Sequence, residues 1–413
     1  MKKFLLGALA AAMLGLASCG GNSTATVAQA DSVAVNAYPE NSPVAKFGKL
    51  HVDSLQLCDK DGNPVQLAGM ITMGWHWCGE CYTRESIENL VNEWGINAFR
   101  LSMYVEEGGY NESPEETYNQ MCNLVDICGE LGIYCIVDWH ILTPGNPLHP
   151  DYAGADDFFQ RISHKYAGAD HVLYEICNEP NNCQEKGNPE KPWECTKDTN
   201  VTWDMIAEYA NRIIPIIHSE YDAVGAQHPI IIVGTPQWDQ LVDACLKVGM
   251  CQGNGKDLCD SLPARDARLK FDNVMYTFHF YSGEHNEGFE KDGKPDYYNM
   301  YSYMYDVLGK LPVFCSEFGL TDANGDGKVD FDRTDKWLLL LSGNNAGKQI
   351  VSFMNWSYSD NERSSSALNQ GACAAKNWND VTPSGEYIKK VLSVVNKGVA
   401  DTTVLKPSNL YTK

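Results

Sequence analysis

Short apolar runs rich in β-branched residues recur along the chain, and stretches with helical periodicity separate them. The runs lie at residues 65–70, 97–103, 133–138, 172–177, 230–234, 274–279, 312–317 and 351–356. The helical stretches include residues 85–94, 115–131, 203–219, 298–308, 334–341 and 384–395, the last with Ser384 as its predicted N-cap. Strands that are apolar on both faces and alternate with helices are typical of parallel βα units. Eight such units predict an α/β fold, a closed (β/α)8 TIM barrel in one domain.

An open doubly wound sheet is the alternative arrangement of βα units. Its usual signature is a glycine-rich phosphate-binding loop directly after a strand. The nearest match here, Gly343 to Lys348, has a different glycine spacing and no following Ser or Thr. The barrel is therefore the better prediction.

The two ends of the chain differ from this pattern. The first residues are basic and then apolar, over a stretch too short for a stable membrane helix. Leu16-Ala-Ser-Cys19 resembles the bacterial lipobox, which implies cleavage before Cys19 and acylation of its sulfur; an ordinary signal peptide with a chance cysteine is the alternative. We predict a lipoprotein signal peptide at residues 1–18, lipidated Cys19 with a flexible tether at residues 19–45, the barrel domain at 46–397 and a C-terminal tail at 398–413.

These ends also predict where the protein resides. An exported bacterial lipoprotein is held by its acyl chains at the outer membrane or the cell surface. The expected partners are therefore the membrane, through the N-terminal anchor, and whatever the barrel binds. We expect a monomer.

The formal net charge of −22 narrows the range of partners. A strongly acidic surface repels phosphate backbones and other polyanions. Nucleic acid and acidic polysaccharides are therefore poor candidates, and a neutral ligand is favoured.

The chain has 15 cysteines, and an exported protein can oxidise them. The disulfide candidates lie in loop-like segments, with connectivity left open: Cys78 and Cys81, Cys183 and Cys195, Cys251 and Cys259. Three cysteines inside apolar runs are predicted to be free core thiols: Cys135, Cys177 and Cys315. Because neither a second close cysteine pair nor a spaced histidine pair occurs, we predict no metal and no other cofactor.

Two glutamates, Glu179 and Glu317, each end an apolar run. A lone carboxylate at a strand end is usually just a solvated loop residue. Two of them on one barrel rim suit glycoside hydrolysis with retention, which needs an acid and a nucleophilic carboxylate about 5 Å apart. The sequence therefore predicts Glu179 and Glu317 as a catalytic pair.

The other predicted strand ends are also polar or aromatic. In a (β/α)8 barrel, active-site residues lie at the carboxyl ends of the strands. The residues at these positions are Arg100, Asp138-Trp-His140, Asn178, Gly234-Thr-Pro-Gln-Trp238, His279-Phe-Tyr281 and Asn355-Trp356. Any one of them could be structural, but the same bias at so many strand ends indicates one site.

Six motifs, in this order along the chain, carry a family resemblance. They are Asn97-Ala-Phe-Arg100, Val137-Asp-Trp-His140, Asn178-Glu179-Pro180, His279-Phe-Tyr281, Ser316-Glu317-Phe-Gly319 and Met354-Asn-Trp356. Together they resemble glycoside hydrolase family 5, most closely its bacterial endo-β-1,4-glucanase branch, from about residue 50 to residue 392.

The resemblance implies a role for each residue. Glu179 would be the acid/base and Glu317 the nucleophile, and Arg100 would keep Glu317 ionised while the negative charge nearby raises the pKa of Glu179. The remaining implied roles are holding the carboxylates for Arg100, His279 and Tyr281, contact with the sugar 2-hydroxyl for Asn178, and sugar binding for His140, Trp356, Trp77 and Trp238. The implied substrate is a neutral β-glucan polysaccharide or oligosaccharide.

The chain departs from that branch near its first and last strands. Met73-Gly74 stands where the branch usually has a His before the glycine, and His76 is displaced along the loop. After the last strand, Asn361 and Arg363 stand where Lys and Glu are usual. We expect these positions to touch distal subsites on the non-reducing side, which puts the glucan preference in question.

Two questions stay open at this stage. Asp322-Ala-Asn-Gly-Asp326-Gly-Lys-Val-Asp330 has the early oxygen spacing of a calcium loop, but Arg333 stands where a bidentate Glu is expected, so a plain turn is the alternative. The alternatives in function are a β-mannanase on the same fold and a non-catalytic glycan-binding lipoprotein.

Overall fold

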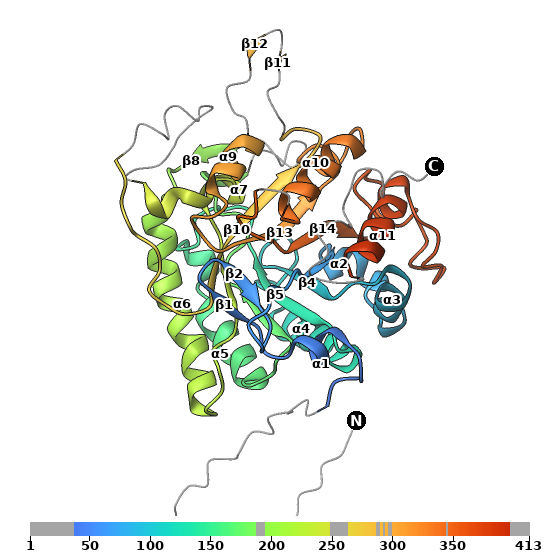
Figure 1. Ribbon diagram of the computed structural model, residues 1–413, viewed down its shortest axis with the longest axis horizontal. Helices are drawn as coiled ribbons and strands as arrows, with labels where there is room; N and C mark the ends of the chain where they lie inside the picture. Colours follow the sequence, from blue (N-terminus) through green and yellow to red (C-terminus); the bar gives the residue numbers. More distant parts are fainter. Residues whose placement is uncertain are drawn as a thin grey trace, which may run out of the picture. The chain divides into compact units, whose positions relative to one another are not determined.

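Eight parallel strands form a closed barrel in the computed structural model, which describes residues 37–186, 195–247, 263–285, 290–291, 294–295, 300–343 and 346–396. The strands follow one another around the barrel in chain order, and the last pairs with the first (Figure 1). They are β3 (Ala68–Thr72), β4 (Ala98–Tyr104), β5 (Tyr134–His140), β6 (Val172–Glu175), β9 (Ile231–Val233), β10 (Val274–Tyr281), β13 (Val313–Gly319) and β14 (Phe353–Tyr358). The predicted TIM barrel and its eight strands are confirmed.

Helices surround the barrel (Figure 1). The longer ones are α3 (Arg84–Asn89), continued by the π-helix η2 (Leu90–Trp94), α4 (Pro114–Leu131), α5 (Ala155–Tyr166), α6 (Trp203–Ala223), α9 (Met300–Val307), α10 (Phe331–Leu341) and α11 (Pro383–Val395). Helix α5 was not among the predicted helical stretches. The predicted N-cap of the last helix was wrong: Thr382 caps α11 by accepting a hydrogen bond from the Gly385 amide, and Pro383 takes the first helical position, so Ser384 lies one residue inside.

Short elements lie outside the barrel strands and the longer helices. They are α1 (Pro43–Phe47), β1 (His51–Asp53), β2 (Gln56–Cys58), α2 (Trp75–Cys78), η1 (Gly79–Cys81), η3 (Pro150–Tyr152), β7 (Cys183–Lys186), β8 (Cys195–Asp198), α7 (Pro236–Asp239), η4 (Val242–Leu246), β11 (Glu290–Lys291) and β12 (Lys294–Pro295). Within the described part of the chain, no helix has the length and apolar character needed to cross a membrane.

The barrel interior is apolar at one end and polar at the other. One buried cluster gathers apolar residues from every barrel strand: Ile71, Ala98, Tyr134, Ile136, Leu173, Ile232, Met275, Phe314 and Met354. Side chains alternate along a strand, so the residue two positions further on lies on the same face. That face then carries Arg100 after Ala98, Asp138 after Ile136 and Glu175 after Leu173, all fully buried. The alternation of side chains thus places an apolar layer inside the barrel and a layer of buried charged residues next to it, nearer the carboxyl ends of the strands.

The folded part begins inside the segment that was predicted to be a tether. The Tyr38 hydroxyl lies 3.0 Å from Nδ1 of His171, and the Val44 amide donates to the Gly132 carbonyl at 3.0 Å. Val44 is also buried in the core. The structured chain therefore starts before the predicted boundary at residue 46, whereas residues 1–36, including Cys19, lie outside the described residues.

Two disulfides are present among the described cysteines. Cys183 pairs with Cys195, and both were among the predicted disulfide candidates. Cys81 pairs with Cys373 rather than with Cys78, which is a buried free thiol. The predicted core thiols Cys135, Cys177 and Cys315 are free and buried. Cys251 and Cys259 lie outside the described residues.

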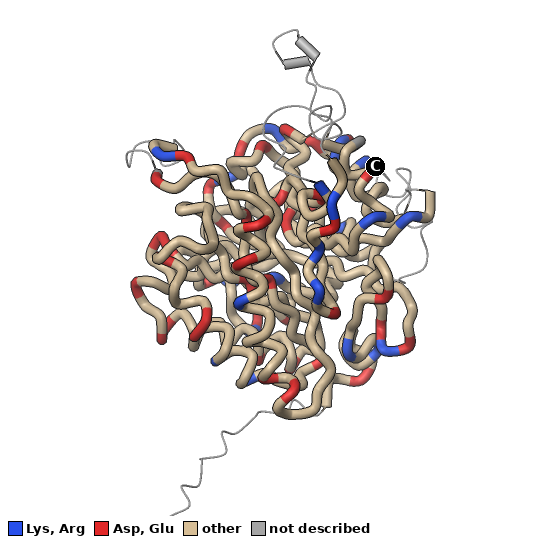
Figure 2. The backbone as a smooth tube through the Cα atoms, turned by 90° about the vertical axis from the view of Figure 1, so that its left-hand side faces the viewer, with Lys and Arg blue, Asp and Glu red and all other residues tan. Residues whose placement is uncertain are grey.

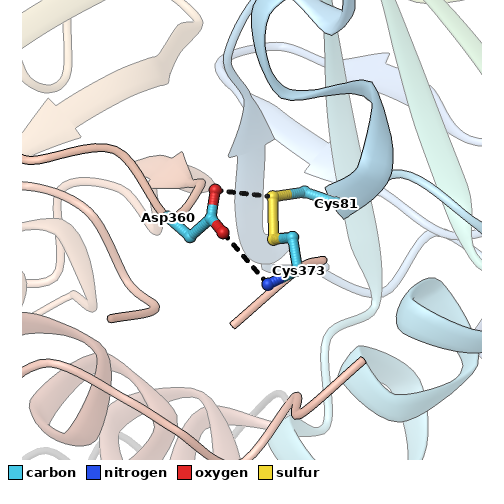
Figure 3. A group of neighbouring side chains, drawn as sticks. All are labelled: Cys81, Asp360 and Cys373. Carbon is cyan, nitrogen blue, oxygen red and sulfur yellow. Dashed lines mark hydrogen bonds between the residues drawn. A yellow bond between two sulfur atoms is a disulfide. The ribbon is translucent and has the colours of Figure 1, made fainter. Parts of the chain in front are cut away.

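The Cys81–Cys373 disulfide joins the segment after β3 to the long segment after β14 (Figure 3). Asp360 lies beside it: its carboxylate accepts a hydrogen bond from the Cys373 amide at 3.0 Å, and its Oδ1 lies 3.5 Å from Sγ of Cys81. Both segments follow barrel strands at the same end of the barrel, so the bridge holds two rim segments together.

Elsewhere, acidic residues are spread along the backbone over the face seen in Figure 2, in keeping with the net charge of −22.

Candidate active site

Arg100 is the centre of a buried polar network at the carboxyl ends of the strands. Its Nε donates to Glu175 at 2.6 Å, its NH1 group donates to Oε2 of Glu317 at 3.0 Å, and its NH2 group donates to Oδ1 of Asn178 at 2.7 Å. The same NH2 group lies 3.0 Å from Oδ2 of Asp138. Three carboxylates thus share one cation with no exposed surface, and their positions are fixed relative to each other.

Both carboxylate oxygens of Glu317 are occupied by donors. Besides the Arg100 contact, Oε1 accepts a hydrogen bond from the Tyr281 hydroxyl at 2.6 Å. The pairing of β13 with β14 shifts register between Cys315 and Phe318, and both Ser316 and Glu317 make contacts inside the barrel. Burial raises the pKa of Glu317, and the adjacent Arg100 guanidinium opposes that rise. Two donors to one carboxylate favour its ionised form.

Glu179 lies in a different environment. Its backbone φ of 44° is in the left-handed region, which is uncommon for a residue with a side chain. Its Oε1 lies 2.9 Å from Nδ1 of His279, whereas Arg100 reaches Glu317 and not Glu179. The pKa of Glu179 is raised to about 8, mainly by burial, with Arg100 opposing and Asp138 and Glu175 adding to the rise. The predicted direction is correct, but burial rather than neighbouring charge is the larger cause.

The two carboxyl groups lie close together. One oxygen of Glu179, one of Glu317 and a nitrogen of His279 are all within 4.8 Å of one another. Because one carboxyl faces a cation and the other does not, the pair can hold one proton, and Glu179 is the group that holds it.

A strained turn at α7 fixes Glu179 from the other side. The Glu179 amide donates to Oδ2 of Asp239 at 2.8 Å, and the Trp238 amide donates to the Pro180 carbonyl at 3.1 Å. Gln237, Trp238 and Asp239 all have positive φ, at 61°, 54° and 59°. Three such residues in a row cost conformational energy, which indicates a constrained geometry. The turn leaves Trp238 41% exposed next to Glu179.

A row of aromatic rings lies at the carboxyl ends of the neighbouring strands β3, β4, β5 and β14. Trp77, 48% exposed, lies 4.9 Å from Tyr104 between ring centroids, and Tyr104 lies 4.3 Å from His140. His140 stacks with Trp356 at 6.0 Å and an interplanar angle of 11°. Nδ1 of His140 lies 2.8 Å from Asp138, and burial lowers the pKa of His140 to about 3, so its ring is neutral.

The site lies within a region that matches a known protein family. The sequence profile described as Cellulase (glycosyl hydrolase family 5) matches residues 58–362, which is well over half of the chain. The chain belongs to glycosyl hydrolase family 5.

Individual relatives agree with this assignment. The chain is 34% identical over 354 residues to Endoglucanase E-5 of Thermobifida fusca, covering 85% of this chain and 65% of that protein. It is 33% identical over 364 residues to an endoglucanase of Clostridium saccharobutylicum, covering 87% of this chain and 69% of that protein. The chain spans about two thirds of the length of these relatives.

Solved structures of a cellulase and an endoglucanase resemble the fold closely. Cellulase Cel5C_n has a TM-score of 0.70 and 38% identity, covering 86% of this chain and 95% of that one. The catalytic domain of Thermobifida fusca endoglucanase Cel5A, in complex with cellotetraose, has a TM-score of 0.69 and 33% identity, covering 85% of this chain and 99% of that one.

The structure of this family 5 chain brings together the residues that its motifs single out. One hydrogen-bonded network contains Arg100, Asn178, Glu179, His279, Tyr281 and Glu317. His140 joins this network through Asp138. The predicted tryptophans lie in the strained turn, for Trp238, and in the aromatic row, for Trp77 and Trp356. Asn178 already donates to the Ile141 carbonyl at 3.0 Å, so one of its two amide hydrogens remains for a ligand.

Sequence reasoning assigned no role to several residues of the site. Glu175, Asp239, Tyr104 and Ser316 all contact the predicted residues. The strand period offered a signal for Glu175, because a carboxylate inside an apolar run and two positions after Leu173 must face the barrel interior. Asp239 gave no such signal, since its place depends on an unusual turn conformation.

Two residues at which the chain departs from the family pattern, Met73 and Asn361, are in contact with each other. Nδ2 of Asn361 lies 2.8 Å from Sδ of Met73, and Oδ1 of Asn361 accepts a hydrogen bond from the Arg363 amide at 2.9 Å. The Arg363 guanidinium donates to the backbone carbonyl of Asn324. Both side chains are therefore engaged within the protein at this rim, and Arg363 reaches the neighbouring loop.

The calcium-like loop packs against that same rim segment. The Asp326 carboxylate accepts hydrogen bonds from Ser364, at 2.6 Å from its hydroxyl. A Cβ at Gly325, which has φ of +77°, would lie 3.1 Å from the Ser365 hydroxyl and 3.7 Å from the Trp356 indole nitrogen. The described residues give this loop no cluster of carboxylates close enough to share an ion. The Asp326 amide donates to Oδ1 of Asn324 at 2.8 Å, as in a tight turn, and the question of calcium binding by this loop stays open.

Some side chains of the site are of types that bind metals. Glu179, His279 and Glu317 lie together, as do Glu175, Asp239 and His279. Their polar atoms are already paired with each other, with Arg100 or with hydroxyl groups, so we do not regard them as metal ligands. The expectation that no metal or cofactor takes part stays a prediction.

Proposed function

We propose that the chain is a retaining endo-β-1,4-glucanase that hydrolyses cellulose-like or mixed-linkage β-glucan. The observation that carries the proposal is the pair Glu179 and Glu317, whose carboxylate oxygens lie within 4.8 Å of each other. Glu317 is paired with the Arg100 guanidinium, whereas Glu179 is paired with His279. Retaining glycosidases use two carboxyl groups at about this separation, and inverting enzymes need about 6.5–9.5 Å to admit a water.

The reaction then follows in two steps. In the first, Glu317 attacks the anomeric carbon, the bond to the leaving oxygen breaks, and Glu179 gives that oxygen its proton. In the second, Glu179 as carboxylate takes a proton from water, the water oxygen attacks the same carbon, and Glu317 is released. Arg100 and Tyr281 stabilise the anionic Glu317 before the attack.

The surroundings of the pair support a neutral sugar polymer as substrate. Trp77 and Trp238 are exposed and follow β3 and β9, which lie opposite each other in the order of strands around the barrel. Aromatic ring faces suit the C–H faces of pyranoses. The named endoglucanase relatives and the cellotetraose complex of a related structure support a β-1,4-glucan. A panel of cello-oligosaccharides, barley glucan and β-mannan tests this: release of short products from the glucans supports the proposal, cleavage of mannan alone identifies a mannanase, and binding without cleavage identifies a glycan-binding protein.

The pH dependence of kcat/KM should reflect the two carboxyl groups. Glu179 must be protonated, and with a pKa of about 8 it loses its proton as the pH rises, so activity should fall above about pH 8. Glu317 must be ionised, and its pKa is raised above the ordinary value of 4.5. As the pH is lowered, activity should therefore start to fall while the pH is still above 4.5. Initial rates on cellotetraose across roughly pH 4–10 check this. An alkaline limb below about pH 6 would show that Glu179 does not hold the proton.

We further propose that the enzyme is a lipoprotein, exported and held at the outer membrane or the cell surface by acylated Cys19. The support is Leu16-Ala-Ser-Cys19 and the small, polar residues that follow it. Replacing Cys19 with Ser should move most of the enzyme from the membrane to the soluble fraction with kcat unchanged, because the acyl chains and not the barrel bind lipid. Fractionation of cells checks this, with Ser23→Ala as a matched control that stays membrane-bound. Equal membrane partitioning of both variants would count against the anchor.

We also propose that Met73, Asn361 and Arg363 rearrange distal sugar binding and weaken the preference for plain cellulose. Asn361→Lys introduces a cation with three donors and removes the contact with Met73. We expect the ratio of kcat/KM on long cello-oligosaccharides to that on mixed-linkage glucan to rise roughly tenfold, equivalent to about 1.4 kcal/mol. Gln370→Lys, which adds the same charge at an exposed position of the same segment, is the control. If both variants leave the ratio unchanged, these positions lie outside the subsites.

A further inference from the structure

A buried chain of hydrogen bonds connects Arg100 to the carboxyl group of Glu179. Nε of Arg100 donates to Oε2 of Glu175 at 2.6 Å, and the Ser316 hydroxyl donates to Oε1 of Glu175 at 2.7 Å. Nε2 of His279 lies 2.9 Å from the same hydroxyl, and Nδ1 of His279 lies 2.9 Å from Glu179. Glu175 and Ser316 are fully buried and His279 is 1% exposed, so water does not supply the partners.

We infer that Ser316 and Glu175 are positioning residues that fix His279 as the tautomer protonated at Nε2. In that tautomer Nδ1 accepts a hydrogen bond from the protonated carboxyl of Glu179. This inference rests on the proposed function, in which Glu179 is the general acid. It gives the acid a partner that favours its protonated form.

Counting the protons at Ser316 leads to this tautomer. Burial raises the pKa of Glu175, and the Arg100 guanidinium opposes that rise. Because Nε of Arg100 donates directly to its Oε2 at 2.6 Å, we take Glu175 as the ionised partner of this ion pair, which can only accept. The one proton of the Ser316 hydroxyl therefore belongs to the bond with Glu175. The Ser316 oxygen can then only accept from His279, so Nε2 must carry a hydrogen. In the opposite tautomer, the Ser316 hydroxyl would have to donate its proton to His279. The oxygens of Ser316 and Glu175 would then lie 2.7 Å apart in a buried site with no proton between them, which is costly.

The same count assigns the proton at the other side of the ring. Burial lowers the pKa of His279 to about 4, so the ring carries one proton at neutral pH, and that proton is on Nε2. Nδ1 is then a bare acceptor 2.9 Å from Oε1 of Glu179. A hydrogen bond at this distance requires the proton to come from the carboxyl group. Burial, which raises the pKa of Glu179, favours the same protonated carboxyl group.

The other groups around the ring favour the same arrangement. Nε2 of His279 lies 3.6 Å from Asp239 and 4.0 Å from Glu175, so two carboxyl groups face the protonated nitrogen. Thr277 contacts the Ser316 hydroxyl and can donate its own proton to it. The titratable groups facing Glu179 and His279 from the packed elements are Arg100 and Tyr104 on β4, Asp138 and His140 on β5, Glu175 on β6, Asp239 on α7, Tyr281 on β10 and Glu317 on β13.

Loss of the Ser316 hydroxyl should reverse the proton position. Without an acceptor at Nε2, the imidazole proton can move to Nδ1 and donate to an ionised Glu179. A donor to the charged form lowers the pKa of a carboxyl group. Ser316→Ala should therefore shift the alkaline limb of kcat/KM toward lower pH by about one unit.

The first test locates the proton in the wild-type protein, and a variant serves only to assign the signals. Nitrogen-15 NMR of the full-length protein, labelled at histidine, reports which ring nitrogen carries the proton, and His279→Gln assigns the signals by their absence. We expect a protonated Nε2 and an unprotonated Nδ1 for His279 near neutral pH. A protonated Nδ1 would overturn the inference. This result is independent of whether the protein hydrolyses any glucan.

The second test separates positioning from general damage. Ser316→Ala should lower kcat/KM on cellotetraose about tenfold at neutral pH and leave kcat/KM on a dinitrophenyl cellobioside within about twofold, since that leaving group needs no acid. Ser352→Ala is the control: Ser352 is also buried and accepts a hydrogen bond from the Leu67 amide, but it lies outside the network. Equal losses on both substrates without a shifted limb would assign Ser316 a merely structural role. If the wild-type protein cleaves no glucan, the proposed function fails, whereas normal hydrolysis with an Nδ1 proton removes only this inference.

Discussion

Glu317→Gln should lower kcat on soluble β-glucan by more than about 10⁴-fold while oligosaccharide binding stays measurable. The amide keeps the shape of the side chain but cannot act as the anionic nucleophile. Its single oxygen can accept the hydrogen bond of Arg100, and its NH2 group can donate to the Tyr281 hydroxyl oxygen. Hydrolysis rates on barley glucan and calorimetric binding of cellotetraose check both parts.

Glu362→Gln is the matched control for this variant. Glu362 is an exposed glutamate whose carboxylate contacts Gln370, away from the buried network. It should hydrolyse glucan at the wild-type rate. Near-normal turnover by Glu317→Gln would mean that the nucleophile has been assigned to the wrong residue.

Glu179→Gln should lower kcat/KM on cello-oligosaccharides by about 10²–10⁴-fold, the usual contribution of a general acid. The effect should depend on the leaving group, because an activated aryl cellobioside departs without a proton. We expect the first-step rate with a dinitrophenyl leaving group to stay within about tenfold of wild type, and the alkaline limb to disappear from the pH profile.

Stopped-flow measurement of the leaving-group burst distinguishes this role from simple misfolding. A variant that has lost only the acid releases one equivalent of dinitrophenol quickly and then turns over slowly, since the second step lacks its base. A slow first step with the activated substrate would contradict the assignment of Glu179 as the acid.

Periodicity along the chain was sufficient to predict the barrel, because each strand is a short apolar run and helical stretches separate most of these runs. The same period placed Arg100, Glu179, His279 and Glu317 at one rim, and the structure brings them together in one network. Strand ends are predictable in this way since parallel strands in a barrel share one direction.

Contacts between distant segments were not predictable from local pattern. Cys81 pairs with Cys373, 292 positions away, although Cys78 is much closer along the chain. Asp239 reaches Glu179 only because three consecutive residues adopt positive φ, which no glycine signals. Residues 38–44 are mostly small or polar, yet Tyr38 and Val44 have partners in the barrel domain that local composition does not reveal.

The central claim is that Glu317 forms a covalent bond to the sugar. An activated 2-deoxy-2-fluoro-cellobioside slows both steps but slows the second more, so a glycosyl-enzyme should accumulate. Mass spectrometry of the intact protein should show one added cellobiosyl group, and peptide mapping should locate it on Glu317. Recovery of unmodified protein that hydrolyses glucan with inversion, or an adduct on Glu179, would contradict the account.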